Sequence, residues 1–229
     1  MKAIVQLAGV MLLWVWSCCL AAQETPAPGA TPPPAAAASD ADQANANAWK
    51  YNLTVDGYIV PDGVSYASPY FTADHNWLHL EARYNYENLH TGSLWAGYNF
   101  AAGKTLQLAV TPMIGGVFGD TTGIAPGCEF SLTYKKLAFS SSNEYVFDTT
   151  AKAGSFFYSW PEVTFSPVSW LKVGGVAQHT KAIDERLSTQ RGFLVGVSVK
   201  NVEFTTYVFD PDKSNPTVVV EMGYSFGGR

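Results

Sequence analysis

Charged side chains recur at every second position in parts of the chain, and this is the first pattern that bears on chemistry. In 76–86 the sequence NWLHLEARYNY puts histidine, glutamate and arginine on one parity and apolar residues on the other. Acids outnumber bases by seven to two among the residues expected on such polar faces, so a shared face would favour cations. These residues are Asp56, His79, Glu81, Arg83, Glu129, Glu144, Glu162, Lys172, Glu203 and Glu221.

Histidines offer a second kind of chemistry. For hydrolysis, an imidazole must hydrogen-bond to a serine and be oriented by a third group. In ENLHTGSLW, His90 lies close to Ser93, but no specific motif surrounds the pair. The sequence therefore predicts that the protein is not an enzyme, with a lipid-directed hydrolase around His90 as the alternative.

Metals and cofactors have weaker support. No cysteine and histidine cluster has structural zinc spacing, so the sequence predicts neither a metal site nor a cofactor. The acids expected in loops are interpreted as a solvated rim, with Ca²⁺ or Mg²⁺ bridging to lipid phosphates as the alternative. These acids are Asp62, Glu87, Asp120, Asp148, Asp184, Glu185, Asp210 and Asp212. Basic residues expected on the same side can contact phosphates directly; they are Lys181, Arg186, Arg191 and Lys213.

The elements that must position the polar face are predicted to be long β-strands. Apolar and polar residues alternate with period two, and no convincing helix follows residue 22. Segments of about ten residues suit a membrane-crossing strand better than a soluble one. Pro69, Pro112 and Pro161 are expected to cause bulges or irregular ladders. Turn signals give twelve candidate strands, with ten as the alternative: 50–60, 64–73, 76–86, 91–101, 104–116, 124–134, 137–147, 154–165, 168–179, 191–200, 201–210 and 217–226.

The first 48 residues are predicted to lie outside the folded domain. Residues 1–22 combine Lys2, an apolar run and a small-residue exit, as in a secretory signal peptide. Residues 23–48 are rich in alanine and proline and lack aromatic and branched aliphatic residues, so they are predicted to be a disordered linker. Lipidation at Cys18 or Cys19 is an alternative to cleavage after Ala22. Cleavage would leave Cys128 as the only cysteine, which excludes an internal disulfide.

Composition excludes several classes of protein. Hydrophobic residues make up 47% of the 229 residues and charged residues only 14%, with a formal net charge of −5. A soluble domain carries about 25% charged residues, so an exterior rich in lysine and glutamate is not available. The acidic balance and the lack of a basic block argue against a nucleic-acid partner.

The connections between the predicted strands alternate in length. One set is short, as in KK (135–136) and KN (200–201). The other set is longer or more polar, as in FGDTTGIAP (118–126) and TKAIDERLSTQ (180–190). Short turns at one end and longer loops at the other are typical of a β-barrel in an outer membrane.

The body of the chain resembles a bacterial outer-membrane β-barrel. Its final strand, VVVEMGYSF, resembles the C-terminal assembly signal of these proteins because it alternates and ends on Phe226, although three more residues follow. The resemblance implies an all-β fold, a closed antiparallel up-and-down transmembrane β-barrel over 49–229. Aromatic residues near the expected strand ends match interfacial girdles: Tyr51, Tyr84, Tyr86, Tyr98, Phe100, Tyr134, Phe139, Phe147, Phe165, Tyr224 and Phe226.

The resemblance also implies a place and a role. It places the barrel in the bacterial outer membrane with the linker in the periplasm, and its partners would be outer-membrane lipids, lipopolysaccharide and the barrel assembly machinery. The predicted function is structural, or passive passage of solutes or ions through an acidic polar lumen. A plug in which Glu81, Arg83 and Lys172 pair with nearby acids, a lipid-modifying hydrolase and a soluble periplasmic β-barrel binding module are the alternatives. The predicted lumen-lining or binding residues are Asp56, His79, Glu81, Arg83, Glu129, Glu144, Lys172, Glu203 and Glu221.

Overall fold

The computed structural model describes residues 48–61, 63–150, 154–182 and 187–228. The predicted signal peptide, and the predicted linker up to residue 47, lie outside these residues. Within the described ranges, no helix is long and apolar enough to cross a membrane.

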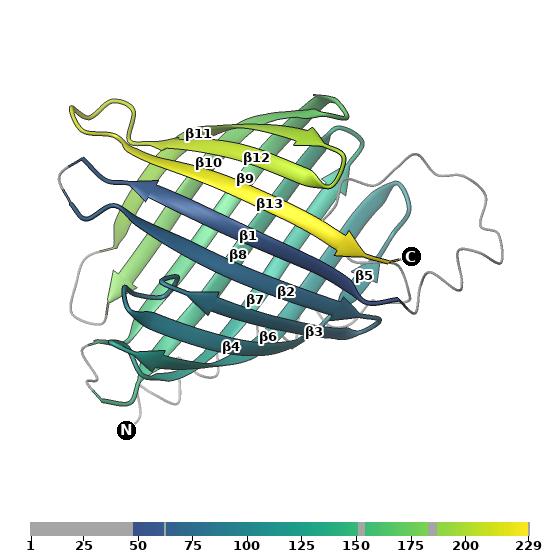
Figure 1. Cartoon of the computed structure of the whole chain (residues 1–229). Coiled ribbons are helices and arrows are strands. Elements are labelled where there is room, and N and C mark those ends of the chain that lie inside the picture. The colour runs from purple at the N-terminus through teal and green to yellow at the C-terminus, as the bar shows by residue number, and fades with distance from the viewer. Residues whose placement is uncertain (1–47, 62, 151–153, 183–186, 229) are drawn as a thin grey trace.

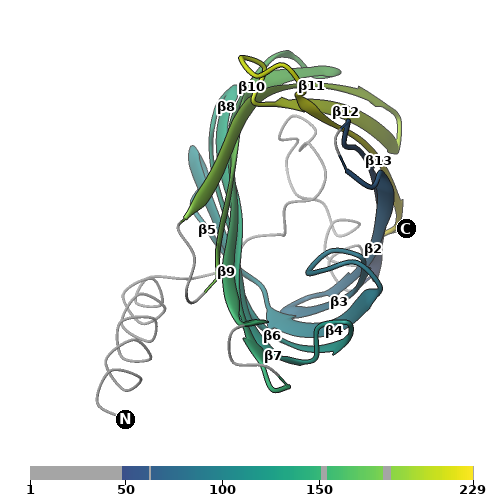
Figure 2. The same ribbon diagram turned by 90° about the vertical axis from the view of Figure 1, so that its left-hand side faces the viewer.

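The described chain forms one antiparallel sheet that closes on itself (Figure 1). Consecutive strands pair with each other, except that β4 and β5 both pair with β6. Strand β1 pairs with β13, so the sheet is a closed ring when seen from one end (Figure 2). The strands are β1 (Lys50–Ile59), β2 (Tyr66–His75), β3 (Leu78–Tyr84), β4 (Thr91–Tyr98), β5 (Phe100–Ala102), β6 (Leu106–Gly119), β7 (Gly123–Tyr134), β8 (Leu137–Asp148), β9 (Phe156–Val168), β10 (Leu171–Ala182), β11 (Ser188–Val199), β12 (Val202–Phe209) and β13 (Thr217–Gly227).

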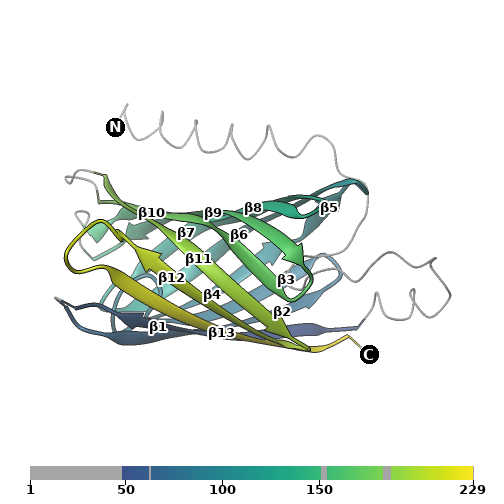
Figure 3. The same cartoon turned by 90° about the horizontal axis from the view of Figure 1, so that it is seen from above.

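The barrel has twelve strands, because β4 and β5 are two pieces of one. Both pieces pair with β6, and only Asn99 separates them. This confirms the twelve-strand prediction over the ten-strand alternative. Each predicted segment overlaps one strand, and the bounds differ by a few residues. Figure 3 shows the strands crossing the barrel obliquely, as closure of a sheet requires.

Prolines interrupt the ladders as predicted, but on one side of a strand only. Pro112 pairs with Cys128 of β7, while its other side faces the break between β4 and β5. Pro161 pairs with Ser141 of β8, while the β9–β10 ladder skips it. Proline has no N–H to donate, so each loses its hydrogen bond toward one neighbour. Pro69 follows the same rule: the β1–β2 ladder runs through it, while the β2–β3 ladder begins only at Tyr70.

The outer face of the barrel is apolar. Leu80 is 38% exposed, whereas Glu81, the next residue of β3, is 5% exposed. The same contrast holds in β13, where Val219 is buried and the next residue, Val220, is 42% exposed. An apolar outer face of this kind is not typical of a protein dissolved in water, so the soluble periplasmic binding module is not favoured. The fold is that of a transmembrane β-barrel.

Aromatic residues gather toward the ends of the strands, as predicted. At one end Tyr51 stacks on Phe226 with ring centroids 5.2 Å apart, and Trp77 stacks on Tyr98 at 5.2 Å. The prediction for Tyr86 is wrong. Strand β3 ends at Tyr84 and the next residue, Asn85, has a φ of 57°, so the chain leaves the strand and its alternation before Tyr86. Its ring instead meets Tyr158 of β9 at 5.8 Å.

The two ends of the barrel differ, as the connection lengths predicted. The turn end carries the short hairpin connections together with both ends of the barrel chain, because Lys50 pairs with Gly227. The loop end carries the longer connections. Two of these are shorter than predicted, because strand pairing continues into them. Strand β6 continues to Gly119, and β7 begins at Gly123. Strand β10 continues to Ala182.

Apolar side chains also fill part of the interior. One buried cluster is built around Trp95 and Met113, and a second around Leu194 and Phe209. Trp95 is 3% exposed and lies flat over Gly115, its partner in the β4–β6 ladder. A Cβ atom at Gly115 would lie 2.4 Å from the indole ring, so only glycine leaves room for this arrangement.

We expect Gly115→Ala to lower the free energy of unfolding by about 1–3 kcal/mol, because the new methyl group forces Trp95 out of its position. The neighbouring Gly116→Ala is the matched control, since a Cβ there meets nothing within 4 Å. Its effect should stay within about 0.5 kcal/mol. Urea unfolding of the barrel in lipid vesicles measures both. A loss as large in Gly116→Ala would contradict this account.

Candidate functional site

All nine residues predicted to line the lumen lie on the inner face of the barrel wall. Asp56, His79, Glu81, Arg83 and Glu144 are buried. The remaining four, which are Glu129, Lys172, Glu203 and Glu221, are partly exposed and occupy the parity opposite to the apolar exterior. That they bind a solute stays a prediction. The structure divides them into three groups.

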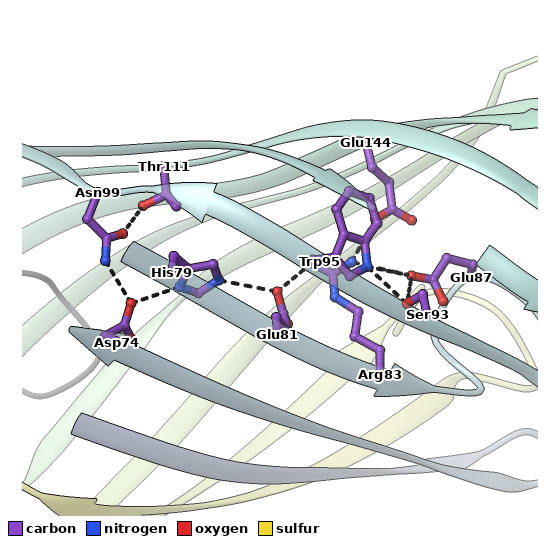
Figure 4. A network of polar contacts seen from close by, with 10 residues as sticks. All are labelled: Asp74, His79, Glu81, Arg83, Glu87, Ser93, Trp95, Asn99, Thr111 and Glu144. Atoms are coloured by element: carbon purple, nitrogen blue, oxygen red, sulfur yellow. Dashed lines mark hydrogen bonds and ion pairs between the residues drawn. The ribbon is translucent and has the colours of Figure 1, made fainter. Parts of the chain in front are cut away.

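The first group is the Arg83 cluster, made of Arg83 with Glu81, Glu87 and Glu144 (Figure 4). The guanidinium Nη2 donates to Glu81 Oε2 at 2.9 Å and Nη1 donates to Glu144 Oε2 at 2.7 Å. Glu87 Oε1 lies 3.6 Å from Nη1. Three acids therefore share one cation, and all four side chains are at most 3% exposed.

The Arg83 cluster ties together strands that are not neighbours. Arg83 lies on β3 and Glu144 on β8, and three strands of the ring stand between them. The guanidinium also lies over the ring of Tyr86 at 4.3 Å and over Trp95 at 4.6 Å. Through Tyr86, which meets Tyr158, the contact reaches β9. These contacts cross the interior, so the polar pairing predicted for a plug is present in this part of the barrel.

The second group lies toward the turn end and is the histidine group, made of His79, Asp74, Glu81 and Glu129. His79 Nδ1 lies 2.8 Å from Asp74 Oδ1, and Asn99 Nδ2 donates to the same oxygen at 2.7 Å (Figure 4). Thr111 in turn donates to Asn99 at 2.7 Å. His79 Nε2 is buried without a hydrogen-bond partner, and the nearest acid oxygen, on Glu81, is 3.6 Å away.

The third group is the acidic group, made of Asp56, Glu162, Glu203, Glu221 and Lys172, on the opposite wall. Asp56 faces Glu221 directly in the β1–β13 ladder, and both Glu221 and Glu162 lie near enough to repel it. One oxygen of Asp56 is buried without a hydrogen bond. Tyr207 donates to Glu221 at 3.2 Å, and Trp160 donates to Glu162 at 2.7 Å.

The acidic group contains one cation. Lys172 of β10 reaches across β11 to pair with Glu203 of β12. Its side chain passes over Gly196, where a Cβ atom would lie 2.4 Å from Lys172 Cε. Four acids against one lysine leave this wall with net negative charge. The Lys172 and Glu203 side chains are 23% and 35% exposed, so water reaches this side.

The structure does not assemble the serine and histidine of the alternative hydrolase. Ser93 Oγ is buried and donates to Glu87 Oε1 at 2.6 Å. The His90 ring is exposed and lies 3.1 Å from Asp120. The two side chains therefore have separate partners, one inside the barrel and one at the loop end.

The loop end bears out part of the predicted acidic rim. Arg191 lies 3.6 Å from Asp212, and Lys213 donates to Asp210 at 2.6 Å, which holds the pKa of Asp210 below its usual value. Two of the basic residues thus already have acid partners. Glu87 and Asp210 are corrections to the solvated rim, because they are only 8% and 6% exposed. Glu87 bonds inward to Ser93. Asp62, Asp184, Glu185 and Arg186 lie outside the described residues.

Three residues of the site were missed by sequence reasoning. Asp74 lay just beyond the predicted end of its strand, although its parity matches that of Ser68 and Thr72. Glu87 was assigned to a loop on position alone. Asn99 has no signal in the sequence, because its role depends on the break between β4 and β5.

No family model matches the chain, and no curated protein matches its sequence. Among solved structures, the KdgM porin aligns with a TM-score of 0.55 at 11% identity, covering 76% of this chain and 99% of that one. The KdgM porin in complex with disordered oligogalacturonate aligns at 0.51 and 8% identity, over 77% and 99% of the two chains. The NanC porin aligns at 0.51 and 12% identity, over 77% and 98%. At these identities the likeness is one of fold: this chain has the barrel architecture of outer-membrane porins.

Proposed function

We propose that this protein is a passive channel of the bacterial outer membrane that prefers small cationic solutes. The observation that carries the proposal is the acidic group, in which four acids face one lysine on a wall that water reaches. Rings or walls of carboxylates raise the local concentration of cations and favour their passage. The contacts of the Arg83 cluster cross the other part of the interior, so the proposed path runs along the acidic group.

The ligand of a structural neighbour is not carried over to this chain. Oligogalacturonate, which is bound in one KdgM porin structure, is a polyanion. An interior wall built from Asp56, Glu162, Glu203 and Glu221 would repel it. The porin architecture supports passage in general, and the charge of the wall supports cations.

Removing acids from this wall tests the proposal. We expect Asp56→Asn and Glu221→Gln each to move the reversal potential in a salt gradient toward zero, and the double variant to move it further. Planar bilayers with the refolded chain measure this. The gradient should stay near 0.1 M, where the Debye length is about 10 Å, because higher salt screens the acids.

Asp212→Asn is the matched control, because it removes one acid from the loop end. Its side chain is 64% exposed and pairs with Arg191 outside the barrel. We expect the selectivity of this variant to equal that of the unchanged chain. Selectivity that changes equally in Asp212→Asn and Asp56→Asn would place its source at the rim and overturn the assignment to the wall.

A structural barrel without conductance is the second candidate, and the cross-barrel contacts of Arg83 favour it. A folded, inserted protein that shows no current would support this candidate. We also propose that lipopolysaccharide contacts the exposed loop end and that the barrel assembly machinery inserts the chain. The turn end would then face the periplasm.

A further inference from the structure

We propose that the histidine group is a binding site for a divalent transition-metal ion, held by His79, Glu81 and Glu129. One donor atom from each of the three residues lies within 4.8 Å of the other two. One nitrogen and two carboxylate oxygens form a ligand set that suits Zn²⁺ and similar ions, with one position left open. The site is distinct from the acidic group of the proposed channel and does not depend on it.

The hydrogen bonding of His79 leaves one nitrogen of its ring, Nε2, to bind a metal ion. An ionised carboxylate only accepts hydrogen bonds, so Nδ1 must donate its proton to Asp74 at 2.8 Å. In the neutral imidazole the lone pair of Nε2 is then available to a metal, and Nε2 is buried without a hydrogen-bond partner. Metal-binding histidines are held in this way, with the second nitrogen donating to a carboxylate.

The supporting residues extend to a second layer. Asn99 and Thr111 continue the chain of hydrogen bonds from Asp74, with lengths of 2.7 Å each. These hydrogen bonds therefore fix the orientation of the imidazole on its Nδ1 side (Figure 4). The ring so held places Nε2 3.6 Å from Glu81 Oε2, and the donor atoms of His79, Glu81 and Glu129 all lie within 4.8 Å of one another.

The net charge of the residues around the histidine group also favours the binding of a cation. Five carboxylates lie in this region with one guanidinium, that of Arg83, which contacts Glu81, Glu87 and Glu144. Together with Asp74 and Glu129, these groups carry a net charge of −4 when all the acids are ionised and His79 is neutral. Buried charges must be paired or neutralised. A divalent ion between His79, Glu81 and Glu129 would remove two of these four negative charges.

Zinc binding by the refolded full chain tests the site. We expect equilibrium dialysis to find one tightly bound Zn²⁺ per chain, and Co²⁺ to give the visible absorption of a bound ion that Zn²⁺ displaces. His79→Gln and Glu129→Gln should each weaken binding by more than the ~10–100-fold that loss of an outer partner costs, and Asp74→Asn should cost about that amount.

His179→Gln is the matched control, because His179 bonds to Thr189 at 3.0 Å, away from the site. It should bind Zn²⁺ like the unchanged chain. Heat-modifiable migration in gels checks that each variant is folded, and Glu129→Gln decides the question if His79→Gln does not fold. A folded, unchanged chain without Zn²⁺ binding, or a Glu129→Gln variant that binds Zn²⁺ as well as the unchanged chain, would overturn the proposal. Neither outcome bears on cation selectivity at the acidic group.

Discussion

Replacing Arg83 with glutamine is expected to lower the free energy of unfolding by about 3–5 kcal/mol, the largest effect of any single change considered. The substitution removes the guanidinium that Glu81, Glu87 and Glu144 share, and it leaves these buried acids beside one another. It also removes the cation over Tyr86 and Trp95. Urea unfolding in lipid vesicles, followed by tryptophan fluorescence, measures the change.

Arg191→Gln is the control for Arg83→Gln. Its side chain is 78% exposed and pairs with Asp212 in solvent, where an ion pair contributes about 0–1 kcal/mol. A double variant, Arg83→Gln with Glu144→Gln, should recover part of the lost stability because one of the orphaned charges is gone. Equal losses at Arg83 and Arg191 would mean that the cross-barrel pair contributes little.

Leu80→Arg is expected to cost about 2–4 kcal/mol of barrel stability, the second largest effect. Leu80 is the third of the seven residues of β3, where it pairs with Ala73 and Ala96 and faces outward. An arginine on this lipid-facing surface must leave water or deform the lipid, at a cost that grows toward the bilayer midplane. Guanidinium-induced unfolding in phosphatidylcholine vesicles measures this loss directly.

The control for Leu80→Arg is the same substitution at a lipid-facing position nearer the end of a strand. Leu137 also faces outward, but it is the first residue of β8 and follows the lysines of the turn. Near the interface an arginine costs about 0–1 kcal/mol, so Leu137→Arg should be tolerated. A loss at Leu137 equal to that at Leu80 would contradict the placement of the membrane around the barrel.

The barrel architecture could be predicted from the sequence because it depends on alternation. Segments such as 193–200 and 217–226 keep one parity apolar for their whole length, and this fixes both the strand and its outward face. Strand ends were harder to predict. Pairing runs on through polar residues at the loop end, as in the extension of β6 to Gly119, and polarity alone does not reveal it.

Strand β8 shows where alternation fails. Its centre reads SSSNEY, with polar residues on both parities. Outward Asn143 accepts hydrogen bonds from Ser141 at 3.1 Å and from Ser159 of β9 at 2.8 Å. These polar groups thus satisfy one another on the lipid face. The sequence cannot show this, because the partner comes from another strand.

The candidate site was predictable as a set of residues but not as an arrangement. Parity places Arg83 and Glu144 on the inner face, yet their pairing depends on how the ring closes across several strands. The division into the Arg83 cluster, the histidine group and the acidic group likewise arises from strand order. Contacts across a barrel have no local sequence signal.

The most direct test of the proposed channel is the reversal potential of the unchanged, refolded chain in a planar bilayer under a potassium chloride gradient. The net negative charge on the wall formed by Asp56, Glu162, Glu203 and Glu221 predicts steady current steps and a reversal potential of the sign that marks cation preference. Anion preference, or an inserted and folded barrel without current, would contradict the proposal.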